Sequence, residues 1–430
     1  MIILKKSNSK NKKILSVITS ILLLEILFCS CNFDVNLASS NSSSAENSDV
    51  NSSSQDSDVS SSSPEINNYT STSYGYDNLS STELKDLYFL IAEYAEKADS
   101  DDISTNATFD VKQLNEVISA YKNDHPEVFW LRSEFKYGED ENGYTIVSLE
   151  YLLSGSDLVT ARQKFDDTLN QALSGAPQGA SDFELEVYAN DYLVSNCVYD
   201  KEAAKTDDII ANENDAYGAL VDKKAVCEGY ARAFQLLCNN LGIDCINVFG
   251  NGKSEPHQWN CVKLEDEWYE VDVTWNDSDD EDGLTTYDYL NITSGEISVN
   301  HSKVPLYKDV SLEEYEGMNR ELNLFVPECN GQKYNYYKQN CATLTDINNA
   351  DDIVNEIANS AYANEESASF LLDNSFNYDD TYDKLLNEGY ISEWIDKANQ
   401  VNSNNPQLDA QCYVYKSEVQ KIITIELKYL

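Results

Sequence analysis

The stretch 224–275 carries two hydrophobic patterns, one with the period of a helix and one with the period of paired strands. In the first pattern, apolar residues recur three and four positions apart, at Cys227, Tyr230, Ala231, Phe234, Leu237, Cys238 and Leu241. Gly242 comes next and can end a helix in a left-handed cap. The spacing therefore predicts a buried helix with Cys227 in its first turn.

Polar residues alternate with apolar or aromatic ones at 257–264 and again at 267–275, with two residues between the runs. This alternation predicts a β-hairpin. If the residues that flank the turn pair with each other, His257 and Asp272 lie on one face as diagonal neighbours, about 7–8 Å apart at the backbone. An imidazole and a carboxylate can bridge that distance. A shift of the pairing by one residue would place them on opposite faces instead.

Cys227, His257 and Asp272 are the residue types of a thiol nucleophile, its base and an orienting acid. The unpaired N–H groups and the dipole at the start of a helix favour a thiolate at Cys227, and the neighbouring Glu228 opposes this to a small extent. Taken singly, the three also fit structural roles: a core cysteine, a hairpin residue stacked on Trp259, and a strand-end cap. Together and in this order they predict a catalytic site.

Two longer motifs contain these residues, AYGALVDKKAVCEGYARAF at 216–234 and HQWNCVKLEDEWYEVDVTW at 257–275. In combination they resemble the transglutaminase-like superfamily, in its secreted bacterial branch. The resemblance implies a papain-like fold with a Cys-His-Asp triad, in which Cys227 is the nucleophile, His257 the base and Asp272 the orienting acid. Weaker similarities lie at 125–130, 190–200 and 287–302.

A thioester-forming enzyme also needs hydrogen-bond donors aimed at the developing oxyanion. The backbone N–H of Cys227 is the natural first donor. Animal transglutaminases add the ring N–H of an upstream Trp, but this sequence has no Trp between Leu131 and Gln258. That departure from the family weighs against transglutaminase activity or assigns the donor to another residue, for which Tyr217 is a candidate.

Similar patterns on both sides of this stretch predict further α+β structure. Before it, helices are expected at 81–98, 111–121, 157–173 and 183–198, and a strand pair at 127–137 and 143–153. After it, strands are expected at 333–338, 367–372, 411–415 and 422–427, and helices at 346–362, 378–387 and 391–401. The fold class is therefore α+β, with a papain-like or transglutaminase-like core flanked by an N-terminal and a C-terminal α+β unit.

The chain begins with a lysine-rich segment and the apolar run 14–28, which together are typical of a targeting segment. The sequence Phe28-Cys29-Ser30-Cys31 resembles a bacterial lipobox with Cys31 as the lipidated residue, although Phe28 and Cys29 are not the usual residues at their positions. A simple signal peptide or an uncleaved anchor is the alternative. The Ser-, Asn- and Asp-rich stretch that follows cannot bury a core and predicts a disordered tether.

The expected division of the chain has five parts. These are a signal peptide at 1–30, a disordered tether at 31–75, an N-terminal α+β unit at 76–178, a transglutaminase-like catalytic core at 179–310 and a C-terminal α+β unit at 311–430. We expect the mature protein to be extracytoplasmic and anchored to the bacterial cell membrane by its lipid, or otherwise secreted.

The formal net charge of −45 over 430 residues argues against binding to nucleic acid or to anionic membranes. We therefore expect no nucleic acid, and contact with a membrane only through the N-terminal lipid. The resemblance to the transglutaminase-like superfamily implies a protein or peptide substrate. No CxxC pair or His-rich spacing predicts a metal site, and no cofactor is expected. The acidic run 276–283 fails the EF-hand pattern because Tyr289 stands where a Glu is required.

The remaining cysteines and histidines have structural patterns. Cys238, Cys245 and Cys261 fall at core positions, where free thiols pack as small apolar groups. Among the other cysteines, the pair expected to form a disulfide is Cys329 with Cys341. The two histidines outside the hairpin, at positions 125 and 301, have no predicted carboxylate partner, so we expect structural roles for both.

Two function classes follow from these patterns. In the first, the chain is a surface-anchored cysteine-dependent amide hydrolase or acyltransferase that acts on proteins or peptides through a thioester, with a peptidase slightly favoured. In the second, it is a non-catalytic cell-surface module that keeps the fold and binds cell-wall or host polymers through its flanking units. The reactivity of the Cys227 thiol separates the two classes.

The lipobox-like sequence generates a first testable prediction. The mature chain is expected to begin at a lipidated Cys31, because the basic and apolar segment before it is removed on export. Mass spectrometry of the mature N-terminus measures this, with Cys31→Ala as the control. A mature chain that begins at any other residue contradicts the prediction.

Overall fold

The computed structural model describes residues 3–9, 12–18, 69–205, 214–277, 286–318, 320–401 and 406–430. The predicted lipidated Cys31, the tether up to residue 68 and residues 278–285 of the acidic loop lie outside the described residues. The strands β1 (Ile3–Ser9) and β2 (Lys12–Ile18) occupy part of the predicted targeting segment, and its removal stays a prediction. The described helices include none with the length and apolar character needed to cross a membrane.

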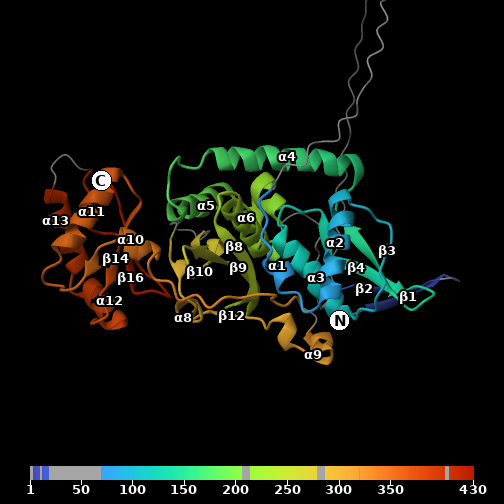
Figure 1. Cartoon of the computed structure of the whole chain (residues 1–430). Coiled ribbons are helices and arrows are strands. Elements are labelled where there is room, and N and C mark those ends of the chain that lie inside the picture. Colours follow the sequence, from blue (N-terminus) through green and yellow to red (C-terminus); the bar gives the residue numbers. More distant parts are fainter. Residues whose placement is uncertain are drawn as a thin grey trace, which may run out of the picture. The chain divides into compact units, whose positions relative to one another are not determined.

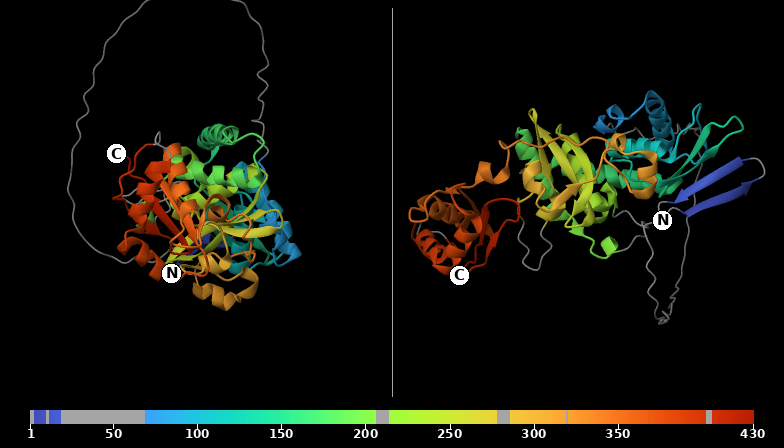
Figure 2. Two further views of the ribbon diagram at one scale, coloured as in Figure 1. Left: turned by 90° about the vertical axis from the view of Figure 1, so that its left-hand side faces the viewer. Right: turned by 90° about the horizontal axis from the view of Figure 1, so that it is seen from below.

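The central part of the chain places helices against one five-stranded sheet (Figure 1). Its strands lie in the order β11-β10-β9-β8-β12, and α6 packs on β8 and β9. Its elements are α5 (Asp182–Asn196), β6 (Val198–Tyr199), η1 (Ala203–Lys205), η3 (Gly218–Asp222), β7 (Lys224–Ala225), α6 (Cys227–Asn240), β8 (Asp244–Gly252), β9 (Glu255–Leu264), β10 (Glu267–Val271), α7 (Val273–Asn276), β11 (Leu290–Ile292), α8 (Ser294–Ile297), β12 (His301–Lys303), η4 (Tyr307–Asp309) and α9 (Leu312–Met318). The views in Figure 2 show the yellow strands of this sheet side by side with the green helices.

The predicted helix at Cys227 is confirmed as α6. Its apolar face is buried, and Tyr230, Phe234 and Leu237 have no exposed surface. The helix ends at Gly242, whose φ of 89° is the left-handed conformation expected of a glycine cap. Burial of this face fixes the helix on the sheet and with it the position of Cys227.

The predicted hairpin register is confirmed, because Glu267 pairs with Leu264 across the β9–β10 turn and the pairing continues to the end of β10. The predicted end of the second strand is wrong. Strand β10 stops at Val271, and the Asp272 side chain accepts a hydrogen bond from the Trp275 backbone N–H at 3.2 Å. This cap starts the short helix α7, so the chain leaves the sheet at the residue that the hairpin was expected to orient.

The predicted elements before the core are confirmed as α2, α3, α4, α5, β4 and β5, with ends shifted by up to four residues. The elements of this part are α1 (Tyr74–Asp77), α2 (Thr82–Lys97), β3 (Ile103–Ser104), α3 (Val111–Asp124), β4 (Leu131–Glu139), β5 (Thr145–Tyr151) and α4 (Gly155–Ser174). Strands β1 to β5 form a sheet in the order β1-β2-β4-β5-β3. One hydrophobic core includes residues of this part and of the central part, from Leu79 to Leu324.

The C-terminal part has a separate hydrophobic core around Trp394, Ile357 and Ile423. Its elements are α10 (Tyr336–Asn340), β13 (Thr343–Leu344), α11 (Asp351–Ala363), β14 (Ser367–Leu372), α12 (Tyr378–Asn387), α13 (Tyr390–Val401), β15 (Val414–Lys416) and β16 (Ile422–Glu426). The three predicted helices and the strands at β14 and β16 are confirmed, and the strand expected at 411–415 is shifted to β15. The strand expected at 333–338 is wrong, because the Asn335 side chain caps helix α10 there.

The cysteines confirm the core positions and correct the disulfide. Cys238, Cys245 and Cys261 are fully buried, as predicted. Cys329 and Cys341 are both free thiols, so the predicted bridge between them is wrong. The sulfur of Cys329 lies instead 3.5 Å from that of Cys261, in a buried cluster behind the sheet.

This pair of sulfurs generates a prediction. Refolding in a glutathione redox buffer is expected to join Cys261 to Cys329, with two thiols converted to a disulfide and one glutathione disulfide reduced to two glutathiones. A cross-link over so long a loop typically stabilises a fold by about 2–4 kcal/mol, so the melting temperature should rise. Peptide mapping measures the linkage, with Cys329→Ser and Cys341→Ser as controls. A bond from Cys329 to Cys341 would contradict it.

Candidate active site

Cys227 is the first residue of α6 and is half-buried. The residue before it, Val226, has extended backbone, and its side chain makes no cap hydrogen bond to the N–H groups of the first turn. Such free N–H groups and the positive end of the helix dipole stabilise a thiolate. The short parallel ladder of β6 and β7 pairs Tyr199 with Ala225 and fixes the chain just ahead of Cys227.

His257 and Asp272 lie together as expected for one face of the hairpin. The Nε2 atom of His257 is 2.6 Å from Oδ2 of Asp272, and both residues are buried. The other carboxylate oxygen accepts the Trp275 backbone N–H. The pairing of β9 with β10 therefore brings the predicted base and orienting acid into contact, and it is the cap on α7 that aims the carboxylate.

The electrostatics of the pair favour its charged form. Burial of the ring by itself would lower the pKa of His257, but the Asp272 carboxylate and then the Cys227 sulfur raise it to about 10. Burial by itself would raise the pKa of Asp272, yet His257 and then His301 lower it to about 2. Between these values His257 is an imidazolium and Asp272 a carboxylate.

The Cys227 sulfur contacts the other side of the His257 ring. A hydrogen bond and the charge of the sulfur are both among the causes of the raised His257 pKa. Because Nε2 is bonded to Asp272, Nδ1 is the ring nitrogen that remains for the sulfur. The structure thus brings all three predicted site residues together in the order sulfur, imidazole, carboxylate.

His301 was expected to have no carboxylate partner, and this expectation is wrong. Its Nε2 atom lies 3.0 Å from Oδ2 of Asp272, the oxygen that also contacts His257. Its Nδ1 atom is 2.7 Å from Oδ1 of Asn300. The weak similarity at 287–302 includes His301 but does not predict this contact, because His301 begins β12, which pairs with β8 and not with β10. The same expectation is wrong for His125, which pairs with Glu127 at 2.9 Å in the N-terminal part of the chain.

The candidate oxyanion donor Tyr217 does not point to the triad. Its ring packs against Phe129 and Phe165, with centroids 4.7 and 6.2 Å away. Tyr199 is closer to the chemistry, because the charges of Cys227 and Asp272, after burial, raise its pKa to about 12. Tyr199 pairs with Ala225 across the β6–β7 ladder, two residues before Cys227, and this explains why the charge of the sulfur acts on its hydroxyl. Only this non-local pairing reveals that Tyr199 lies near the site.

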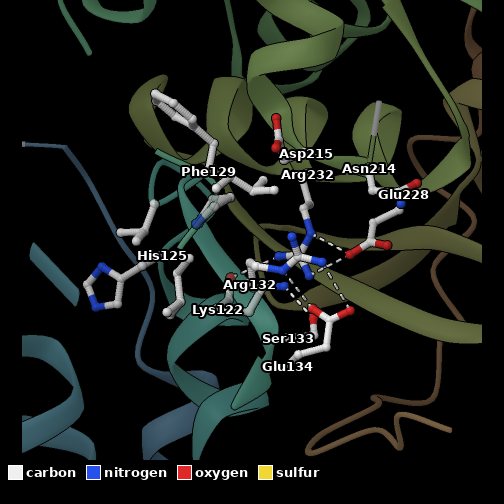
Figure 3. Close-up of a pocket in the computed structure, with 14 residues that line it drawn as sticks. Lys122, His125, Phe129, Arg132, Ser133, Glu134, Asn214, Asp215, Glu228 and Arg232 are labelled. Carbon is white, nitrogen blue, oxygen red and sulfur yellow. Dashed lines mark hydrogen bonds and ion pairs between the residues drawn. The ribbon is translucent and has the colours of Figure 1, made fainter. Parts of the chain in front are cut away.

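A small pocket of about 50 Å³ lies beside the next residue, Glu228 (Figure 3). Arg232 donates to Glu228 at 2.9 Å and to the backbone carbonyl of Lys122 at 3.0 Å. This pairing offsets the charge that Glu228 places beside the thiol. Arg132 and Glu134, which also line the pocket, form an ion pair, as Figure 3 shows. The pocket holds paired charges and does not include the triad.

Two groups of side chains among the described residues could share a metal ion, each with ligand atoms within 4.8 Å of one another. They are His257, Asp272 and His301 in one group and Cys261, Glu270 and Cys329 in the other. In the first group a metal would take the ring nitrogens that hold Asp272, so metal binding and a working triad exclude each other. In the second group Glu270 already pairs with a lysine, Lys303, at 2.6 Å.

Comparisons with known proteins agree with the motifs. Residues 167–273 match the family model described as the transglutaminase-like superfamily. The kyphoscoliosis peptidase of Mus musculus is 32% identical over 120 residues, which cover 25% of this chain and 18% of the mouse protein. The Homo sapiens protein of the same name is 32% identical over 129 residues, covering 27% and 19%. The chain therefore spans less than a fifth of the length of these curated relatives.

A crystal structure of a TGase is similar at 18% identity with a TM-score of 0.25, over 42% of this chain and 52% of that one, and we draw nothing from a similarity so low. The family model matches a segment that contains Cys227 and His257 and ends one residue after Asp272. The comparisons thus identify a segment of the chain, residues 167–273, that is similar to the transglutaminase-like superfamily.

Proposed function

We propose that the protein is a cysteine-dependent amide hydrolase that acts on protein or peptide substrates through a thioester. The observation that carries the proposal is the contact of His257 with Asp272 at 2.6 Å, with the Cys227 sulfur on the other side of the same ring. A nucleophile, a base and an orienting group within hydrogen-bonding reach of one another are the minimum for such chemistry.

The geometry supports a reaction in two steps. The Cys227 thiolate attacks the amide carbonyl, and the His257 imidazolium donates its proton to the departing amine, which leaves a thioester. Neutral His257 then takes a proton from water as the water attacks the thioester, and the acid product leaves. Asp272 keeps the imidazole in one orientation and stabilises its charged form throughout.

The oxyanion of each step needs donors on the side of the helix terminus. The backbone N–H of Cys227 supplies one, since no side chain caps this end of α6. For the second we propose the Tyr199 hydroxyl, in place of the Tyr217 hydroxyl. Its ring is partly buried, and the charge of the sulfur contributes to its pKa.

Transfer of the acyl group to a lysine amine is the second candidate reaction. It needs a channel that admits a long amine and excludes water. The absence of a Trp between Leu131 and Gln258 removes one known part of that arrangement, so we favour hydrolysis. The alternative function, from another class, is a non-catalytic module. It is supported by the general observation that relatives can keep a fold without its activity.

We further propose that the enzyme acts outside the cytoplasmic membrane, anchored there through a lipid on Cys31. The lysine-rich start, the apolar run 14–28 and the polar stretch after Cys31 support this location. The substrate would then be a protein or peptide of the cell surface or its surroundings.

The reaction is tested by incubating the mature protein with a mixed peptide pool and a dansylated primary amine. New amino termini are expected to form faster than dansyl label is incorporated, because water takes the acyl group. Both signals should vanish in Cys227→Ala. Faster dansyl incorporation would make the protein an acyltransferase, and the absence of both signals in the wild type would favour the non-catalytic module.

A substitution of the orienting acid gives a second prediction for this site. Asp272→Asn is expected to lower turnover by roughly 10²- to 10⁴-fold, because both oxygens of Asp272 accept N–H donors and an amide NH₂ would face one of them. The same change removes the charge that raises the His257 pKa. The alkaline limb of the activity profile, near pH 10 in the wild type if His257 controls it, should move toward the ordinary imidazole value of about 6.5.

Asp266→Asn is the matched control, because Asp266 is exposed in the turn of the same hairpin. Steady-state kinetics across pH measure both effects, and circular dichroism verifies the fold. Wild-type turnover in a folded Asp272→Asn variant would remove Asp272 from the mechanism.

A further inference from the structure

We propose that His301 is a positioning residue of this site, which holds the Asp272 carboxylate at the same oxygen that His257 contacts, so that the carboxylate keeps both its charge and its orientation. The inference rests on the proposed function, since it concerns how the base is oriented. It goes beyond the three residues that the motifs contain.

The hydrogen bonds around Asp272 carry the inference. Oδ2 lies 2.6 Å from Nε2 of His257 and 3.0 Å from Nε2 of His301, so two imidazole rings converge on one oxygen. Oδ1 accepts the Trp275 backbone N–H at 3.2 Å. A carboxylate accepts and does not donate, so each of these contacts requires a proton on the partner nitrogen. His301 therefore fixes the carboxylate at a third point.

The burial of His301 shows that the contact is built into the fold. The side chain has no exposed surface. The Trp275 ring lies 4.3 Å from the His301 ring between centroids, and the Trp259 ring lies 5.0 Å from it. Asn300 is hydrogen-bonded to its other nitrogen. With both nitrogens bonded and both aromatic neighbours in contact, the ring has one orientation available.

The opposite strand leaves space for this arrangement. His301 pairs with Gly252 of β8. A Cβ atom at Gly252 would lie 2.8 Å from the Trp275 ring and 3.3 Å from Cγ of His257, closer than ordinary contacts. Only a glycine at this position allows the Trp275 and His257 rings to approach β8, and the Trp275 ring in turn packs on the His301 ring.

The groups near His301 define the expected effect of pH. Asp272 and His257 face it directly, and the Tyr289 ring lies 5.7 Å away. Asn300 links it to the carboxylate of Glu418, which pairs with Lys253. His301 is among the causes that lower the pKa of Asp272 after burial has raised it. Without His301, Asp272 should gain its proton at a higher pH and the ion pair should fail there.

The experiment measures alkylation of Cys227 by iodoacetamide from pH 2 to pH 9, with peptide mass spectrometry to isolate this cysteine. It needs no substrate. The variants are His301→Leu, which removes the donor, and His301→Gln, whose side-chain N–H can reach Asp272 in its place. His125→Gln is the matched control, because His125 is also paired with a carboxylate, outside the site.

In the wild type Cys227 should react faster than Cys412. His301→Leu is expected to move the acidic limb of the profile to higher pH by about one unit, which is about a tenfold lower rate on that limb. His301→Gln should recover most of the rate, and His125→Gln should match the wild type. A shift of the limb separates positioning from packing, since lost packing alone lowers stability without moving it.

Three outcomes decide between the claims. If Cys227 of the wild type does not react faster than Cys412, the proposed function fails. If Cys227 reacts and the profile of folded His301→Leu is unchanged, the role of His301 is overturned and the function stands. If His301→Leu does not fold, ¹⁵N-histidine spectra of the wild type decide, since a neutral-pH Nε2 of His301 without a proton would overturn the inference.

Discussion

A buried carboxylate is the constraint on which the site depends. Asp272 is 1% exposed, and an unpaired charge at such a position would cost several kcal/mol. Two imidazole N–H groups and one backbone N–H offset that cost. The three donors belong to β9, to β12 and to α7, so the sheet, its edge strand and the turn after β10 must all be in place before the charge is tolerated. The same requirement aligns the base with the nucleophile.

The sheet meets this requirement through non-local pairing. Strand β8 lies between β9 and β12, so His257 and His301 reach Asp272 from the two neighbours of one strand. Gly252 on β8 gives the rings room at this point. Helix α6 is held on the other elements by a fully buried apolar face, which places its uncapped N-terminus and Cys227 beside the ring. Packing therefore decides the geometry, and the hydrogen bonds select among the few arrangements it leaves.

The sequence predicted what short-range patterns control. The helix at Cys227 and the register of the hairpin follow from apolar spacing and from a two-residue turn, so both could be derived. The end of β10 could not, because a side-chain cap competes there with strand pairing. Contacts between residues far apart in the sequence could not be predicted either. His301 and Tyr199 come to the site through pairings with β8 and β7. The weaker similarities at 190–200 and 287–302 include both residues but do not indicate these contacts.

The charge state of the site bears on how it can react. The stability that the raised His257 pKa contributes is fully present below the unfolded value of about 6.5 and is lost as pH rises through about 10. The stability from Asp272 is fully present above about 4 and is lost as pH falls through about 2. Near neutral pH the folded chain therefore keeps His257 protonated.

An imidazolium has a proton on each ring nitrogen, so it cannot remove a proton from a thiol. It can, however, stabilise a thiolate and supply the proton that a departing amine needs. Cys227 at an uncapped helix terminus offers the matching charge. The charge of His257 depends on the Asp272 carboxylate, which both histidines contact, so the ring is suited to give a proton to the leaving amine.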